Sequence, residues 1–223
     1  MVRRPRPVHV LIDWNSELLS LRSSAQGEDA EVARRALKQV CRDVGKLLHQ
    51  EAGETALFLH LRAYHGWRRG FEPTPRRRGL EEARRFFSPN DPQDRGLAAY
   101  SQRPLQAVRT LEFGDKLLGA RDERLCGQGE NNQDHHLPFT LQDNTTGPPR
   151  EKMVDTALVA DLIHLALESD ESWLVVIGQD ADLVPGILAA DGLLHGTDRR
   201  VIFFVRGGIN KTNRKMDDLI CRR

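Results

Sequence analysis

The chain has 223 residues, 39% of them hydrophobic, which suits one sizeable α/β domain or one domain with a large insertion. Its formal net charge of +1 gives no overall attraction to nucleic acid, although a local basic patch can still bind a polyanion. The three cysteines are far apart and odd in number, which excludes a disulfide framework and fits a protein of the reducing cytoplasm. The apolar run near the N-terminus is short, so it is neither a signal peptide nor a membrane span.

The first predicted strand covers residues 8–12, an apolar run that ends in the polar segment 13–16. An acid directly after a buried strand is costly unless it has a partner or reaches the edge of the sheet, so Asp13 is a candidate site residue. The alternative is that Asp13 or Ser16 caps a helix. Residues 28–50 then repeat apolar side chains at helical spacing and predict a helix.

Segment 66–103 follows a second predicted strand at residues 55–64 and changes in character. Arginines crowd between aromatic residues, a pattern typical of surfaces that bind single-stranded nucleic acid. The alternative is a solvated insertion with a short helix near residues 80–87. The candidate nucleic-acid contacts are Arg68, Arg69, Arg76, Arg77 and Arg78, with Trp67 and Phe71 as candidate base-stacking residues.

Residues 105–113 predict a third strand, and residues 114–150 lack periodicity. A stretch that long is usually a functional loop or a mobile one. Cys126, His135 and His136 lie in it, but zinc requires a fourth ligand and a tighter spacing, so no zinc site is expected.

Residues 152–168 predict a strong helix with an acid in its first turn. Asp155 falls on the apolar stripe, whereas Asp161 falls on a different face and is a poor candidate for the same site. A helix that follows a parallel strand starts at the carboxyl edge of the sheet, where Asp155 can point. The alternative is favourable pairing with the helix N-terminus, which does not explain a place on the stripe.

A fourth strand is predicted at residues 173–178, and two aspartates one residue apart follow it. A helix begins at residue 182, so Asp180 and Asp182 lie in a strand-to-helix loop, where open α/β sheets keep their sites. The alternative is that Asp182 caps the helix and Asp180 is a loop acid. A fifth strand at 200–205 and a helix at 210–220 complete the predicted elements.

Four aspartates from three segments are therefore expected at one edge of the sheet: Asp13, Asp155, Asp180 and Asp182. Clustered carboxylates repel one another unless a cation neutralises them, and Mg²⁺ or Mn²⁺ suits such an open site. A metal-bound water there can attack a phosphodiester. The sequence shows no Walker loop, no G-x-G-x-x-G motif and no paired serine and histidine nucleophile.

At residues 11–15, 152–162 and 177–185 the sequence resembles the three motifs of NYN domains, members of the PIN-like superfamily of metal-dependent nucleases. The resemblance covers roughly residues 8–65 and 150–220. It implies a Rossmann-like three-layer α/β/α sandwich, a pocket that binds Mg²⁺ or Mn²⁺, and RNA as the usual substrate. By this resemblance the acidic core is Asp13, Asp155 and Asp180, with Asp182 a further acid and Asn15 a polar helper. Gln179 replaces a common glycine and Trp14 is bulkier than usual, so both can alter access to the pocket.

These inferences together predict a single domain over residues 1–223, with a mostly parallel five-stranded sheet, an arginine-rich insertion and a polar loop. The expected function is that of a cytoplasmic metal-dependent endoribonuclease. Its substrate is single-stranded or structured RNA, and Lys152 is a further candidate contact for that RNA. A homodimer or a protein partner is also compatible with the sequence, and a membrane partner is not expected. The first alternative is a non-catalytic RNA-binding or regulatory module, which would be expected to lose acids. The second is a phosphatase of another α/β family, one type of which requires an acid where Asn15 stands.

Overall fold

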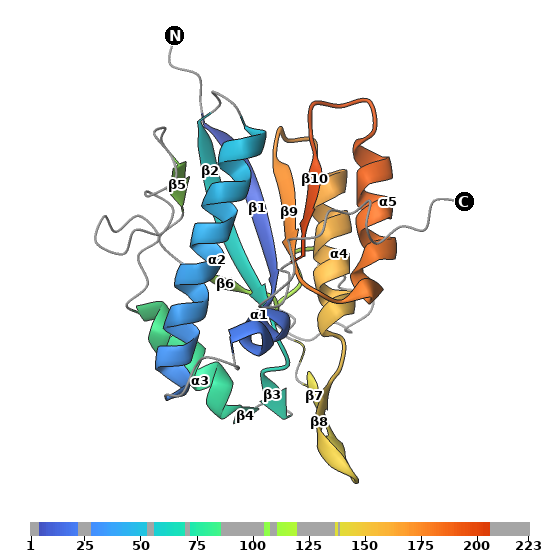
Figure 1. The fold of residues 1–223 in the computed structure, drawn as a ribbon. Coiled ribbons are helices and arrows are strands. Elements are labelled where there is room, and N and C mark those ends of the chain that lie inside the picture. Colours follow the sequence, from blue (N-terminus) through green and yellow to red (C-terminus); the bar gives the residue numbers. More distant parts are fainter. Residues whose placement is uncertain are drawn as a thin grey trace, which may run out of the picture.

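The central sheet of the computed structural model is parallel and has five strand positions (Figure 1). The structure describes residues 5–21, 28–52, 56–69, 72–85, 105–107, 111–119, 137 and 139–205. The sheet has the order β10-β9-β1-β2-β5, and every pairing in it is parallel. Its strands are β1 (Arg6–Asp13), β2 (Leu57–Tyr64), β5 (Leu105–Ala107), β6 (Glu112–Phe113), β9 (Trp173–Ile177) and β10 (Val201–Phe204).

Two short strands share one edge position of this sheet. The segment β5 pairs with the first half of β2 and β6 with its second half, so the single strand predicted at residues 105–113 is split in two. The five strand positions of the sequence prediction are therefore retained, and the predicted fold class is confirmed.

Helices cover both faces of the sheet, which makes three layers (Figure 1). On one face lie α1 (Trp14–Leu21), α2 (Asp29–Glu51) and α3 (Pro75–Arg85), and on the other lie α4 (Val154–Leu167) and α5 (Val184–Leu194). No helix in the described ranges combines the length and the apolar composition needed to cross a bilayer.

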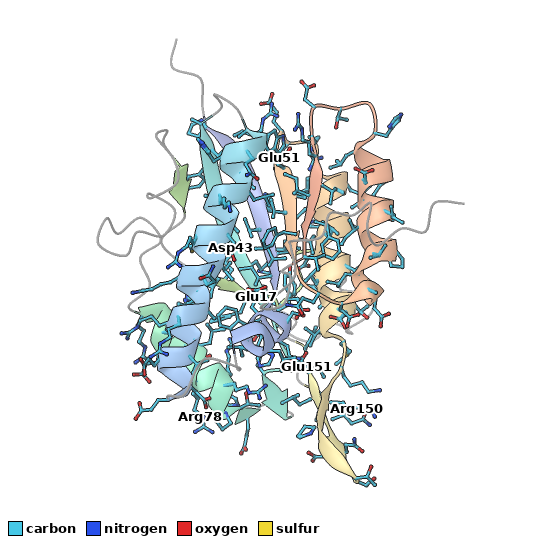
Figure 2. All side chains as sticks on the ribbon, in the orientation of Figure 1. Glu17, Asp43, Glu51, Arg78, Arg150 and Glu151 are labelled. Atoms are coloured by element: carbon cyan, nitrogen blue, oxygen red, sulfur yellow. The ribbon has the colours of Figure 1, made fainter. Side chains whose placement is uncertain are left out.

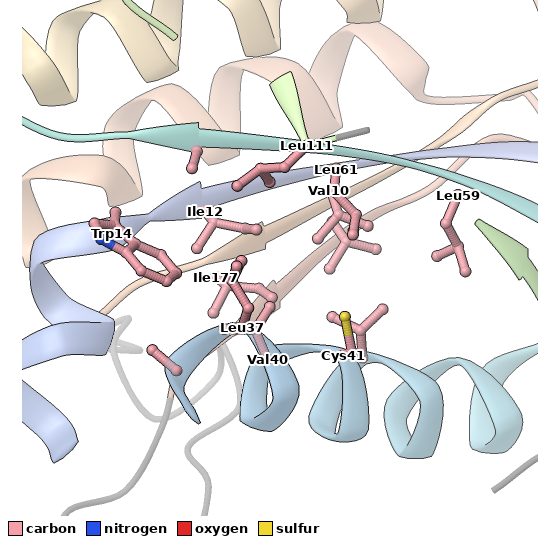
Figure 3. Close-up of a cluster of buried hydrophobic side chains, with 14 of the residues drawn as sticks. Val10, Ile12, Trp14, Leu37, Val40, Cys41, Leu59, Leu61, Leu111 and Ile177 are labelled. Carbon is pink, nitrogen blue, oxygen red and sulfur yellow. The ribbon is translucent and has the colours of Figure 1, made fainter. Parts of the chain in front are cut away.

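Side chains along β1 alternate between the two faces of the sheet and so contribute to the hydrophobic core on both faces. Val10 and Ile12 are fully buried on the face that α2 covers, where Leu37 packs against the sheet (Figure 3). Leu11 points to the opposite face and packs with α4 and α5. All five residues of β9 are buried, as expected for a parallel strand between two helical layers. Burial of each such side chain contributes about 1.5–3 kcal/mol.

Three local elements differ from the sequence prediction. Helix α1 begins directly after Asp13, where the sequence indicated a helix only as the alternative in which Asp13 or Ser16 caps it, and α3 begins at Pro75 rather than near residue 80. The segment predicted as a loop contains an antiparallel hairpin of β7 (Leu141–Asn144) and β8 (Gly147–Glu151), which projects from the edge of the domain (Figure 1). A second small antiparallel pair joins β3 (Arg68–Arg69) to β4 (Glu72–Pro73).

Several predicted features lie outside the described residues. They are the helix at 210–220, the whole of segment 86–104, Cys126, His135 and His136.

Candidate acidic site at the carboxyl edge of the sheet

The ends of β1 and β9 bring two acidic segments together. Ile12 pairs with Ile177, so Asp13 at the end of β1 lies beside Gly178. A Cβ atom at Gly178 would lie 3.2 Å from the Cβ of Asp13 and 3.5 Å from its Oδ2. The missing side chain of Gly178 thus leaves room for the Asp13 carboxylate, and the chain then continues to Asp180 and Asp182 at the same edge.

Asp13 is a buried carboxylate that also caps α1. Only 5% of the residue is exposed, Oδ1 accepts a hydrogen bond of 3.2 Å from the backbone N–H of Ser16, and Oδ2 accepts one from its hydroxyl. Burial raises the pKa of Asp13, the two hydrogen bonds from Ser16 act in the opposite direction, and the charges of Glu151 and Asp180 raise it further.

Asp180 caps the short 3₁₀ helix at Ala181–Leu183. Its Oδ1 accepts a hydrogen bond of 2.9 Å from the backbone N–H of Asp182, and its side chain is exposed. The alternative interpretation of the sequence gave the capping role to Asp182, whereas in the structure Asp180 has it. Asp182 lies in the first turn with an exposed side chain.

Asp155 is the second residue of α4 and lies half-buried at the edge of the apolar stripe. The buried members of that stripe flank it, for example Val154 and Leu158. The pKa of Asp155 is raised to about 6, chiefly by burial and then by the charges of Asp13, Asp180, Glu151 and Asp182. We call Asp13, Asp155, Asp180 and Asp182 the acidic edge, because their charges act on one another at this end of the sheet.

Asp161 has a different role, as its helical phase indicated. It is 1% exposed, and its Oδ2 accepts hydrogen bonds from the Nε of Arg62 at 3.0 Å and from the Tyr64 hydroxyl at 2.7 Å. Its Oδ1 accepts the backbone N–H of Leu118 at 2.8 Å. Burial, and then the Asp161 charge, raise the pKa of Tyr64 well above its usual value. These bonds fix α4 to β2 and hold the helix that carries Asp155.

The basic candidates divide into exposed and buried side chains. Lys152 and Arg78 are exposed, and Arg76 and Asn15 are half-buried. The side chains of Arg68 and Arg69, and the whole of Phe71, lie outside the described part of the chain.

Arg77 and Trp67 correct the sequence prediction, because both are buried. Arg77 is 5% exposed, with its Nε 2.6 Å from Glu81 and its guanidinium 3.7 Å from the ring centroid of Phe113. Its Nη2 also lies 3.5 Å from Asp115. Trp67 is 1% exposed and therefore cannot stack on a base in this structure.

Two further acids near the site were missed in the sequence. Glu151 ends the hairpin strand β8 and affects the pKa of both Asp13 and Asp155. Glu17 is fully buried in the first turn of α1. The spacing of four residues from Glu151 to Asp155 is the one signal that could have indicated the first.

The donor set fits a hard divalent cation by its chemistry, because carboxylate oxygens are the ligands that Mg²⁺ and Mn²⁺ prefer. Among the described residues, no three His, Cys, Asp or Glu side chains lie close enough together to hold one ion. The carboxylates of the acidic edge thus share an electrostatic environment but are not gathered around a single point.

A separate cavity of about 250 Å³ lies against the sheet away from these acids. His9 and His60 line it as a stacked pair with ring centroids 5.0 Å apart, beside Arg62 and His164. Burial, followed by the neighbouring His60, lowers the pKa of His9. The chemistry of the acidic edge is a better guide to function than the size of this cavity, because clustered carboxylates specify a ligand class and the cavity lining does not.

Searches of protein families, curated proteins and solved structures found no match to the chain.

Proposed function

We propose that the protein is a metal-dependent endoribonuclease of the NYN type that hydrolyses RNA phosphodiester bonds in the cytoplasm. The observation that carries the proposal is the acidic edge, in which carboxylates from three distant segments repel one another at the carboxyl edge of a parallel sheet. Burial, and then the charges of the neighbouring acids, raise the pKa of both Asp13 and Asp155. A bound cation relieves the repulsion between the carboxylates, so the site favours a divalent metal ion.

Each residue of the acidic edge has a part in this proposal. Asp13, Asp155, Asp180 and Asp182 are the candidate ligands for Mg²⁺ or Mn²⁺, although no three of them lie within reach of one ion in the described structure. When bound, the cation would supply an activated water and would neutralise charge on the phosphate. Asn15 lies in the first turn of α1, two residues after the buried Asp13, and can orient a phosphate oxygen through its side-chain amide. Lys152 is exposed three residues before Asp155, and its charge would offset the repulsion between a polyanionic substrate and the carboxylates.

A non-catalytic RNA-binding module is the second candidate. Two observations favour it: Asp13 and Asp180 each cap a helix, and no three potential ligands in the described segments lie within reach of one ion. In that case the acids would have a structural role, and binding would depend on the exposed bases.

Asp180→Asn tests the proposal. The amide oxygen still accepts the N–H of Asp182, so the cap is kept while the charge is lost. The purified protein is incubated with RNA and with DNA in the presence of Mn²⁺, Mg²⁺ or a chelator. We expect cleavage of RNA that requires a metal, with a loss of about 10²–10³-fold in the variant.

Asp191→Asn is the matched control, because Asp191 is an exposed acid in α5. Circular dichroism verifies that both variants are folded. If Asp180→Asn cleaves RNA as the parent does at saturating Mn²⁺, the metal-ligand role is wrong. Binding of RNA by the parent without cleavage under any metal condition would identify the non-catalytic module instead.

A further inference from the structure

Helix α5 is apolar on all sides, although only one of its sides is buried. Of its 11 residues one is charged, Asp191, and none is basic. Ile187, Ala190 and Leu194 pack into the core. A helix that is apolar all round normally lies between two packed layers. The outer side of α5 is therefore an apolar face without a partner among the described residues.

The outer side of α5 combines large and small apolar residues. Leu188 and Leu193 are 43% and 47% exposed. By helical phase, Pro185, Ala189 and Gly192 lie between these two leucines, and all three are exposed as well. A contiguous exposed apolar surface of this kind is uncommon on a monomeric protein and marks a contact surface.

Helix α4 extends this surface, because it packs beside α5 in the same layer (Figure 1). Leu167 is 67% exposed at its C-terminal end, and Ala160 is exposed one face-repeat before it. The opposite layer shows the usual pattern, since the exposed residues of α2 are mostly charged, as at Glu51 (Figure 2). We call the outward apolar side of the two helices the α4–α5 face. It consists of Ala160, Ile163, Leu167, Pro185, Leu188, Ala189, Gly192 and Leu193.

The charge of the α4–α5 face argues against two classes of occupant. Neither α4 nor α5 contains a lysine or an arginine. A nucleic acid or an anionic membrane surface is held mainly by such basic residues, so neither class matches this face. An apolar helical surface of a protein is the class that matches it.

The spacing along α5 matches a second copy of the same helix. Leu188 and Leu193 lie at equal distances from the midpoint between residues 190 and 191, and so do Ala189 and Gly192. If two copies of α5 pair antiparallel about a two-fold axis through that midpoint, Ala189 of one copy lies across from Gly192 of the other. The leucines then flank these small residues on both sides. A two-fold dimer requires a self-complementary patch of this kind.

Gly192 is explained by such a pairing and not by the packing of one chain. A Cβ atom at this position would meet no other part of the described chain within 4 Å, and the residue lies within a helix. An alanine would stabilise the helix more than a glycine does. The missing side chain does allow a second helix to approach closely, because the distance between two helix axes depends on the side chains at their contact.

The size of the α4–α5 face corresponds to a weak dimer. At 1.5 Å per residue, the 14 residues of α4 and the 11 residues of α5 measure about 21 Å and about 16 Å. With about 10 Å of width for each helix, the face covers about 400 Å² in projection. The accessible surface follows the side chains and is larger, so two copies bury on the order of 1,000 Å². That area lies at the lower end of specific interfaces, where association is transient.

We propose that the α4–α5 face is the interface of a two-fold homodimer in which α5 packs antiparallel against α5 of a second copy. The inference is independent of the proposed nuclease activity, because no carboxylate of the acidic edge belongs to this face.

Analytical ultracentrifugation of the full chain, at concentrations from about 1 to about 300 µM, tests the interface. We expect an equilibrium between monomer and dimer with a dissociation constant in the micromolar range. Leu188→Glu places an unpaired charge in the apolar interface and should raise the dissociation constant by at least about tenfold. Gly192→Leu should raise it by about as much, since the new side chain blocks the approach of the second helix. That side chain has open space in the monomer, so the variant should melt no lower than the parent at a low protein concentration.

Leu19→Glu is the matched control, because Leu19 is 51% exposed in α1, on the opposite layer. It should leave the dissociation constant unchanged, and circular dichroism verifies that each variant is folded. A parent that stays monomeric at the highest concentration overturns the proposal. This includes a monomer that Leu188→Glu destabilises, since another part of the same chain would then cover the face. A dimer that both α5 variants leave intact has its interface elsewhere, which also overturns the proposal. If Leu188→Glu dissociates the dimer and Gly192→Leu does not, the close antiparallel pairing of α5 is overturned.

Discussion

Replacement of Asp155 by asparagine should stabilise the metal-free protein at pH 8. The pKa of this carboxyl group is raised from 3.8 to about 6 by burial and by the surrounding acids. The folded protein therefore binds the proton more tightly than the unfolded chain does. The stability that comes from this proton is fully present below about pH 4 and is lost as the pH rises through about 6. Above that pH the ionised Asp155 opposes folding, whereas an asparagine does not.

The size of the effect follows from the two pKa values. The difference between 3.8 and about 6 corresponds to about 3 kcal/mol at 1.36 kcal/mol for each pKa unit. Asp155 is only half-buried, so solvent screening reduces this to about 1–2 kcal/mol. For a chain of this length, each kcal/mol raises the melting temperature by roughly 2–4 °C. We therefore expect Asp155→Asn to melt about 2–8 °C above the parent at pH 8.

Thermal unfolding in the presence of a chelator, followed by circular dichroism at pH 8 and at pH 4, measures this difference. At pH 4 the parent carboxyl is largely protonated and resembles the amide, so the two proteins should melt together. Asp191→Asn, on the exposed side of α5, should show no comparable gain at pH 8. The reasoning is refuted if Asp155→Asn is no more stable than the parent at pH 8, or if the gain is the same at both pH values.

Three further predictions concern the residues around the site. Asp161→Ala removes the buried carboxylate that pairs with Arg62, which then keeps only the exposed Glu112, and should lower the free energy of unfolding by about 3–5 kcal/mol, as measured by urea denaturation. Arg77→Ala removes the buried ion pair with Asp115 and an aromatic contact, and should lower the free energy of unfolding by roughly 3 kcal/mol in the same assay without a selective decrease in RNA affinity in the folded protein. Joint replacement of Arg76 and Arg78 by alanine, in a cleavage-deficient variant, should weaken the salt dependence of binding to single-stranded RNA. The slope of log affinity against log salt should fall by roughly 0.7 for each phosphate that an arginine no longer neutralises. An unchanged slope would show that neither arginine contacts the RNA.

The sheet could be predicted from the sequence because its central strands leave little choice. The run Trp173–Ile177 is apolar throughout and buried throughout, which only a strand between two helical layers satisfies. The edge strands β5 and β6 were harder to predict from the sequence. Leu105–Ala107 and Glu112–Phe113 are too short to show a period, and their pairing depends on the two halves of β2 rather than on their own composition. The hairpin at 141–151 was missed for a related reason, since its strands are mostly polar and its register shifts between Gln142 and Asn144.

The residues of the candidate site could be predicted where the sequence pattern of a single segment determines their position. Asp13 and Asp180 each follow a buried strand, and that pattern places them at the carboxyl edge without any knowledge of their neighbours. The burial of Arg77 could not be predicted from its own segment. Nothing in its own segment distinguishes it from Arg76 or Arg78, and its burial depends on Phe113 and on other residues far along the chain. The close contact between Nδ1 of His65 and Oε1 of Glu151 has the same character, because 86 positions separate the two residues and neither belongs to a recognisable pattern.

The caps formed by Asp13 and Asp180 do not account for the charges of these residues. An asparagine or a serine caps a helix about as well as an aspartate does, and neither would repel its neighbours. Capping thus explains a polar side chain at each position, but not carboxylates at two positions whose charges act on each other and on Asp155. The same caps have a second consequence, because a carboxylate held by a backbone donor loses little further freedom when it binds an ion. In Asp180 the donor engages only Oδ1, so one oxygen stays available at the exposed side of the loop. Under the proposed function, these capping hydrogen bonds preorganise the two carboxylates for a cation.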